Sequence, residues 1–212
     1  MQDDAGLKKI LTFSWAYNLF KRAIGTRSAY AWMDREFWRL APGQKVLDIG
    51  CGPATLLDHV RFPAGVKYVG FDISEAYVEH ARQRWANDPD KQFVVGVAED
   101  FIAAMPPEMA DADLVLMNGL LHHLEDGEAT TALQLARKAL AAEGRLVCLE
   151  GCFLVRHEPI DRWLVSRDRG RNVRSEPEWK RLVAGVFDHF ETYVLTGLLR
   201  IPYTHIAIVA RR

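Results

Sequence analysis

Short apolar runs alternate with longer segments of helical spacing through the middle of the chain. Runs typical of buried strands end at Asp48 and recur at residues 67–71, 92–97, 113–117 and 145–152. Between them, helical patterns occupy residues 54–60, the segment from Ser74 to about Trp85, and residues 128–142. Ser74 is a preferred residue type for a helix N-cap. Strands that alternate with helices in this way predict a parallel sheet with right-handed crossovers.

The two ends of the chain depart from this alternation. Residues 6–38 have helical periodicity and many aromatic side chains, and Gly25 divides them into two predicted helices. Most of these rings are expected to pack on the sheet. Basic residues among them also allow a helix on a membrane surface, which Asp3 and Asp4 disfavour. A turn at residues 41–44 ends this appendage, and the C-terminal part is predicted to hold a helix at 177–187 and strands at 191–195 and 205–210.

Composition narrows the class of protein. The 212 residues suit one α/β domain with a sizeable core and an appendage. Lys and Arg number 27 against 28 Asp and Glu, so no global basic field indicates a nucleic-acid partner. The 3 cysteines are scattered without metal-ligand spacing, and no metal site is expected. With no signal peptide or spanning segment visible, we expect a soluble, cytoplasmic protein.

The most informative stretch follows the first strand, where Asp48 precedes Gly50, Gly52 and Pro53. Two glycines let a ligand lie against bare backbone, and Pro53 suits the first turn of a helix, whose N–H groups carry partial positive charge. This pattern predicts a nucleotide-type site. The dinucleotide fingerprint requires a third glycine where this chain has Thr55, which disfavours NAD and FAD. An acid before the glycines suits a ligand with an ammonium or sulfonium charge.

A second acid, Asp72, ends the next strand at the position expected to bind ribose hydroxyls. At these residues the chain resembles the class I S-adenosylmethionine-dependent methyltransferases, whose first motif reads Asp/Glu-x-Gly-x-Gly-x-Gly. Asp48, Gly50 and Gly52 match this motif, whereas Ala54 replaces its third glycine. The resemblance implies S-adenosyl-L-methionine as cofactor and S-adenosyl-L-homocysteine as product.

The resemblance also implies the architecture. We expect an α/β, Rossmann-like, doubly wound fold with a seven-stranded, mostly parallel sheet, an antiparallel C-terminal edge hairpin and an N-terminal helical lid. Residues 1–40 would form the lid and residues 41–212 the methyltransferase domain, with residues 153–187 as its acceptor-binding segment.

By the same resemblance, Asp48 would lie near the methionine amino group, Gly50 and Gly52 beside the methionine moiety, and Asp72 on the ribose. Val97 stands where the family often has an adenine-binding aspartate, so Glu99 or Asp100 takes that role or adenine binds through backbone groups alone. The full set expected at the cofactor is Asp48, Gly50, Cys51, Gly52, Asp72, Ile73, Ala98, Glu99 and Asn118.

The acceptor side is less defined. His122 and His123 follow the fourth strand and resemble a leucine-histidine-histidine pattern of small-molecule members of the family. One of them is either the catalytic base or a structural group that bonds a loop carbonyl. Six arginines between residues 156 and 174 form either a solvated face or a site for an anionic acceptor. The candidate acceptor-binding residues are Tyr17, Arg169, Arg200, Tyr203 and His205, of which the last three either line the pocket or secure the final turn.

The sequence therefore predicts methyl transfer to an O, N or C atom of a small molecule, such as an anionic, sugar or phenolic metabolite. Alternatives are a methyltransferase acting on RNA or protein, which would need a broad basic surface, and a module that holds the cofactor without chemistry. A dehydrogenase is the weakest alternative because Thr55 disrupts the dinucleotide fingerprint. The oligomeric state is not predicted.

Overall fold

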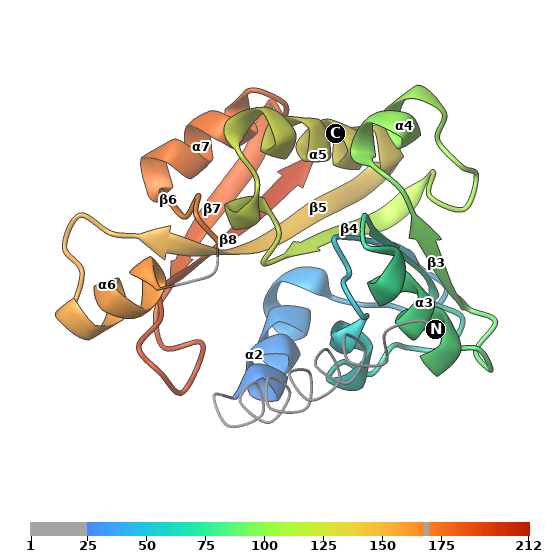
Figure 1. The fold of residues 1–212 in the computed structure, drawn as a ribbon, viewed down its shortest axis with the longest axis horizontal. Coiled ribbons are helices and arrows are strands. Elements are labelled where there is room, and N and C mark those ends of the chain that lie inside the picture. The colour runs from blue at the N-terminus through green and yellow to red at the C-terminus, as the bar shows by residue number, and fades with distance from the viewer. Residues whose placement is uncertain (1–24, 168–169) are drawn as a thin grey trace, which may run out of the picture.

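A twisted, mostly parallel sheet with helices on both faces forms the body of the molecule (Figure 1). The computed structural model describes residues 25–167 and 170–212. Seven strands follow the order β3-β2-β1-β4-β5-β8-β7, and the short β6 pairs with the end of β5. The strands are β1 (Lys45–Ile49), β2 (Lys67–Asp72), β3 (Lys91–Val95), β4 (Ala112–Asn118), β5 (Leu140–Phe153), β6 (Arg174–Ser175), β7 (His189–Leu195) and β8 (His205–Arg211).

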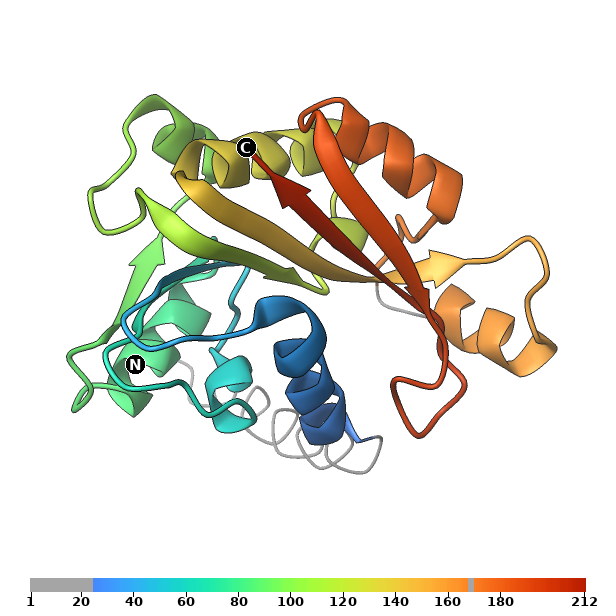
Figure 2. The ribbon, with the colours of Figure 1, turned by 180° about the vertical axis from the view of Figure 1, so that it is seen from behind.

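Six helices and three short helical turns are seen in the described residues. The helices are α2 (Thr26–Met33), α3 (Glu75–Arg84), α4 (Ala98–Ala103), α5 (Asp126–Ala139), α6 (Pro159–Ser166) and α7 (Glu176–Ala184). The turns are η1 (Asp34–Trp38), η2 (Thr55–Asp58) and η3 (Leu121–His123). As expected for a doubly wound fold, α4, α5 and α7 lie on one side of the sheet and α2 and α3 on the other (Figures 1 and 2).

Side-chain alternation along the buried strands builds the two layers of the core. Leu47 and Ile49 of β1 pack toward α4, α5 and α7, whereas Val46 packs toward α2, η2 and α3. The central strands β1 and β4 are thus covered on both faces, which is why their sequences are nearly continuous apolar runs. Because β1 to β5 pair in parallel, their carboxyl ends lie at one edge of the sheet, which in open α/β sheets is where ligands bind.

The C-terminal strands form the expected antiparallel hairpin. β8 lies between β5 and β7 and is antiparallel to both, with Leu195 opposite His205 at the turn end. Ser74 caps α3 as predicted, its hydroxyl accepting a hydrogen bond from the Tyr77 N–H. The fold class is therefore confirmed, with β6 as an additional strand.

Two expectations for individual elements were wrong, and the helix α6 was not predicted. The helix predicted at residues 54–60 is only the 3₁₀ turn η2, because Ala54 adopts a left-handed conformation that interrupts a regular helix. The helix predicted at 128–142 ends at Ala139, and the chain then enters β5 directly. The arginine-rich segment after β5 contains an unpredicted helix, α6.

The appendage before the sheet is described from Gly25 onward. Met33 and Trp38 are fully buried against the face that carries α3, and Arg145 of β5 donates hydrogen bonds to the carbonyls of Phe37 and Trp38. The assignment of residues 1–40 as a lid stays a prediction, since residues 1–24 lie outside the described part. Within residues 25–167 and 170–212, we find no helix with the length and apolar character required to span a membrane.

Candidate functional site

The turn between β1 and η2 is held by backbone hydrogen bonds to β2. The Gly50 and Cys51 N–H groups both donate to the Phe71 carbonyl, at 2.8 and 3.0 Å. Gly50 has a φ of 74°, and a Cβ at that residue would lie 2.7 Å from the Leu120 side chain. Only glycine fits there, because both the conformation and the close approach exclude a side chain. The turn therefore presents backbone, rather than side chains, at the end of β1.

Asp72 joins this turn to the start of α3. One carboxylate oxygen accepts from the Gly52 N–H at 2.8 Å, and the other accepts from the Ser74 N–H at 2.8 Å. A carboxylate has about four acceptor sites. Each oxygen of Asp72 thus keeps a lone pair for a ligand hydroxyl while the carboxylate fixes the glycine turn.

Ala54 occupies the third glycine position of the motif in a conformation that glycine adopts more readily. Its φ and ψ are 55° and 38°, and the side chain is fully buried. The short η2 that follows provides no helix N-terminus of the length that the sequence pattern suggested. Anion binding by a helix dipole is therefore not available at this turn, and the backbone N–H groups and nearby carboxylates define its polarity.

Asp48 lies beneath the turn, with an exposed fraction of only 3%. The Tyr68 hydroxyl of β2 donates a hydrogen bond to its carboxylate at 2.6 Å. Burial raises the pKa of Asp48 from 3.8 to about 7, the Tyr68 hydrogen bond opposes this shift, and the charge of Asp72 adds to it. The carboxylate is thus poised to change its charge near neutral pH. Sequence reasoning missed Tyr68, although a hydroxyl within an apolar strand is itself a signal of a buried polar partner.

The other expected cofactor residues lie at the ends of neighbouring strands. Ile73 follows Asp72 and is 70% exposed, and Ala98 and Glu99 open α4 just after β3, which pairs with β2. Cys51 is buried in the glycine turn, and burial raises the pKa of its thiol. The topology therefore brings these residues to the same edge of the sheet as Asp72.

Asn118 ends β4 and stands out by its unsatisfied polar atoms. Both its amide nitrogen and its amide oxygen are buried and have no hydrogen-bond partner among residues 25–167 and 170–212. A buried amide without partners costs free energy, on the order of 1–3 kcal/mol per group. A polar ligand group at the strand ends would remove this cost.

His122 is held in the turn η3 after β4 by a buried carboxylate. The Glu150 carboxylate, on β5, lies 2.5 Å from His122 Nδ1. It also accepts from the backbone N–H groups of Leu120, Leu121 and His122, at 3.0, 2.8 and 3.4 Å. Glu150 is 1% exposed, and the hydrogen bonds from these donors offset the free-energy cost of burying its carboxylate. Sequence reasoning missed Glu150, although a charged residue inside an apolar strand was the available signal.

Two glycines enclose the edge of the His122 ring that carries Nε2. A Cβ on Gly119 would lie 3.5 Å from Cε1, and a Cβ on Gly170 would overlap Cδ2. The Asn172 N–H donates to the His122 carbonyl at 3.0 Å, which secures the crossing segment. The exposed His123 ring stacks at a tilt on His122, with centroids 4.2 Å apart. The two histidines thus differ sharply in environment.

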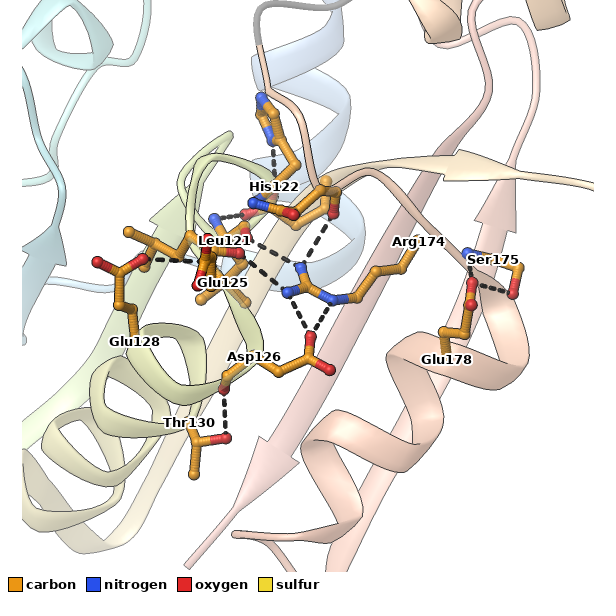
Figure 3. Close-up of polar contacts among 12 residues, drawn as sticks. Leu121, His122, Glu125, Asp126, Glu128, Thr130, Arg174, Ser175 and Glu178 are labelled. Carbon is orange, nitrogen blue, oxygen red and sulfur yellow. Dashed lines mark hydrogen bonds and ion pairs between the residues drawn. The ribbon is translucent and has the colours of Figure 1, made fainter.

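Arg174 also stabilises the turn η3, through hydrogen bonds to backbone carbonyls (Figure 3). Its guanidinium donates to the carbonyls of Leu121, Leu124 and Asn172 and to the Asp126 carboxylate, at 2.7–3.0 Å. The guanidinium also lies 4.9 Å from the centre of the Trp179 ring. One of the six arginines is therefore buried and structural, which corrects the expectation that they all belong to a solvated face or an acceptor site.

Three of the five acceptor candidates lie in or next to the loop before β8, and the other two lie outside the described residues. The side chain of Arg200 packs on Gly25 at the start of α2, and the Tyr203 hydroxyl packs on Gly151 of β5. The Tyr203 and His205 rings lie 4.7 Å apart. These contacts bring the loop before β8 against both α2 and β5. Tyr17 and Arg169 lie outside the described residues.

Comparisons of the sequence and of the fold with known proteins both find methyltransferases. Residues 47–146 match a family model described as a methyltransferase domain. The chain is 32% identical over 114 residues to a demethylmenaquinone methyltransferase of Symbiobacterium thermophilum, covering 51% of this chain and 43% of the relative. It is 25% identical over 152 residues to a desmethylxanthohumol 6'-O-methyltransferase of Humulus lupulus, covering 65% and 39%. The chain spans less than two thirds of the length of the curated relatives it matches.

Among solved structures, the fold is similar to that of a TehB-like SAM-dependent methyltransferase from Corynebacterium glutamicum. The TM-score is 0.64 at 17% identity, and the similarity covers 99% of this chain and 100% of the other. At this identity the likeness is one of fold. It extends over the whole methyltransferase architecture, beyond the residues that the family model matches.

Proposed function

We propose that this chain, a member of the class I S-adenosylmethionine-dependent methyltransferases, methylates a hydroxyl oxygen of a small-molecule acceptor. The observation that carries this proposal is the buried His122–Glu150 pair beside the strand ends, with Nδ1 and the carboxylate 2.5 Å apart. A histidine fixed in this way is suited to remove a proton from an acceptor hydroxyl.

The residues at the strand ends fit S-adenosylmethionine. That cofactor, when bound, supplies a methyl group activated by the positive charge of its sulfonium. Asp48 offers a negative charge beneath the glycine turn, and Asp72 keeps acceptor sites for ribose hydroxyls. Within residues 25–167 and 170–212, the buried amide of Asn118 has no hydrogen-bond partner, so it is open to a polar group of the ligand. The bare backbone of Gly50 and Gly52 lets the ligand approach the turn closely.

His122 would receive the acceptor proton at Nε2. Because the Glu150 carboxylate accepts from Nδ1–H, it favours the tautomer in which Nε2 carries a lone pair. It also stabilises the imidazolium that forms on proton transfer. Gly119 and Gly170 lie against the ring atoms on either side of Nε2, and the His122 side chain is buried. Exclusion of water and alignment are the main demands on a protein that accelerates a displacement at carbon.

Several features favour a small acceptor over a nucleic acid or protein. The net charge is −1, and Arg174 of the arginine-rich segment is turned inward onto Asp126. The side chain of Arg200, in the loop before β8, packs against Gly25 at the start of α2. The relatives named for methyl transfer to demethylmenaquinone and desmethylxanthohumol also support a small-molecule acceptor.

A screen of phenols, hydroxylated quinones, sugars and carboxylates, read out as S-adenosylhomocysteine formed, would identify the acceptor. With that acceptor, His122→Gln should lower kcat about 10²–10⁴-fold and leave the cofactor dissociation constant unchanged. His123→Gln is the matched control and should stay within a few-fold of the parent. Equal, small effects of the two substitutions would contradict the role of His122 as base.

A further inference from the structure

Helix α6 buries one side against the protein and exposes two large apolar side chains on the other. Asp161 and Val165 are buried against the body of the molecule. Ile160 and Trp163 are 66% and 55% exposed, and Val155, just before the helix, is 98% exposed. We call Val155, Ile160 and Trp163 the α6 apolar patch. Three large apolar side chains exposed within one short segment are uncommon on a surface that contacts only water.

The exposure of this patch is fixed by a buried polar network. The Asp161 carboxylate accepts from both the N–H and the hydroxyl of Thr204, at 2.8 and 2.5 Å, and lies 3.0 Å from His157 Nε2. Thr204 is fully buried in the loop before β8. These contacts hold α6 in one rotation about its axis. The hydrogen bonds of Asp161 therefore fix the orientation of α6 in which Ile160 and Trp163 are exposed.

Three exposed arginines lie in the same segment as the α6 apolar patch. Arg156, Arg162 and Arg167 are all exposed, and the exposed acid among residues 155–167 is Glu158. Along α6 and its C-cap, helical spacing places Ile160, Trp163 and Arg167 in one row. The Arg167 guanidinium lies 5.7 Å from the centre of the Trp163 ring. This face is thus both apolar and positively charged.

We propose that the α6 apolar patch and its arginines dock on a bilayer surface that contains anionic lipid. Tryptophan and aliphatic side chains enter the boundary between headgroups and acyl chains, while arginines reach anionic headgroups. The helix projects beyond the end of the sheet, at one extreme of the molecule in both views (Figures 1 and 2). The helix therefore lies at the periphery of the molecule, where a flat surface can approach it.

The position of α6 gives this docking a consequence for the reaction. The helix leads within a few residues to Gly170, which packs on the His122 ring. With a bilayer against α6, an acceptor dissolved in it would lie on the side of the molecule from which the chain leads to His122. This consequence rests on the proposed function, whereas docking itself does not require catalysis.

Flotation of the purified chain with lipid vesicles tests the proposal without turnover. The chain should float with vesicles of phosphatidylcholine and phosphatidylglycerol, and binding should weaken with added salt and be lost on phosphatidylcholine alone. Trp163→Ala should weaken binding about tenfold, as expected when a large apolar side chain leaves the interface. Arg156→Gln and Arg167→Gln should each weaken it about fivefold.

Tyr77→Ala is the matched control, because Tyr77 is an aromatic side chain on α3 with an exposed fraction of 45%. It should bind anionic vesicles like the parent. Cofactor binding by calorimetry, which should be the same in parent and variants, reports folding. The proposal is overturned if the parent fails to float at low salt, or if Trp163→Ala and Tyr77→Ala weaken binding equally. It is also overturned if the patch instead mediates self-association, seen as a dimer in sedimentation that Trp163→Ala abolishes while no variant binds lipid.

Discussion

Replacement of the buried Asp48 by asparagine should make the protein more stable at alkaline pH. The carboxylate is 3% exposed, and within residues 25–167 and 170–212 its side-chain hydrogen-bond partner is the Tyr68 hydroxyl. Burial raises the pKa of Asp48 from 3.8 to about 7. Asp48→Asn keeps the shape of the side chain and its ability to accept from Tyr68, and removes the charge.

The size and sign of the effect follow from proton linkage. Because the pKa of Asp48 in the folded state lies above its value in the unfolded chain, the folded state binds more protons between about pH 4 and pH 7. The contribution of Asp48 to the free energy of unfolding therefore falls as pH rises through that window. A shift of this size corresponds to about 4 kcal/mol, at the order-of-magnitude level, once the carboxylate is ionised.

Urea unfolding of the parent and of Asp48→Asn at pH 5, 6, 7 and 8 measures the effect directly. The stability difference in favour of Asp48→Asn should grow with pH by about 2–4 kcal/mol and level off above about pH 8. Asp188→Asn is the control, since the Asp188 side chain is 80% exposed, and its difference from the parent should stay nearly constant. A pH-independent difference for Asp48→Asn would refute a raised pKa at Asp48.

Other substitutions test the rest of the site. Asp72→Ala should weaken S-adenosylhomocysteine binding by about 1.5–3 kcal/mol through loss of charge-assisted hydrogen bonds, measured by calorimetry; unchanged affinity would exclude Asp72 from the ribose site. Glu150→Gln places an NH₂ group against backbone or ring donors, so it should lower kcat about 10²-fold or more with little change in KM. A rate equal to that of the parent would mean that Glu150 does not orient His122. Arg174→Met should lower the free energy of unfolding by about 2–4 kcal/mol in urea titrations, because the carbonyls that accept from Arg174 lose their donor. A change below about 0.5 kcal/mol would mean that the hydrogen bonds of Arg174 shown in Figure 3 do not stabilise the fold. Ala54→Gly should stay within about 1 kcal/mol of the parent, since relief of the left-handed conformation offsets the entropy of glycine and the lost methyl group; a loss above about 2 kcal/mol would argue against strain at Ala54.

The fold and the strand-end positions could be read from the sequence because both follow from local patterns. Apolar runs located the strands, and the same topology that makes them parallel brings Gly50, Asp72 and Asn118 to one edge. The parts that could not be predicted depend on contacts between distant segments. Arg174 looked like one member of a charge run, and its buried position depends on the turn at residues 121–126, about 50 residues earlier.

Two polar residues inside apolar strands were the missed signals. Tyr68 and Glu150 each interrupt a run that otherwise reads as buried, and each proved to hold a residue that the sequence did single out, Asp48 and His122. A buried strand tolerates such groups only when partners satisfy them. Ala54 shows the opposite case, where helical spacing at residues 54–60 was overridden by the left-handed backbone of a tight turn.

Titration calorimetry with S-adenosylmethionine, S-adenosylhomocysteine and NAD tests the central claim most directly. We expect micromolar binding of both sulfur ligands and no binding of NAD. Binding near pH 7 should also release protons, seen as a dependence of the heat on the buffer, because a cationic ligand above Asp48 favours its ionised form. Proton release should disappear in Asp48→Asn. Binding of NAD, or no binding of either sulfur ligand, would contradict the account.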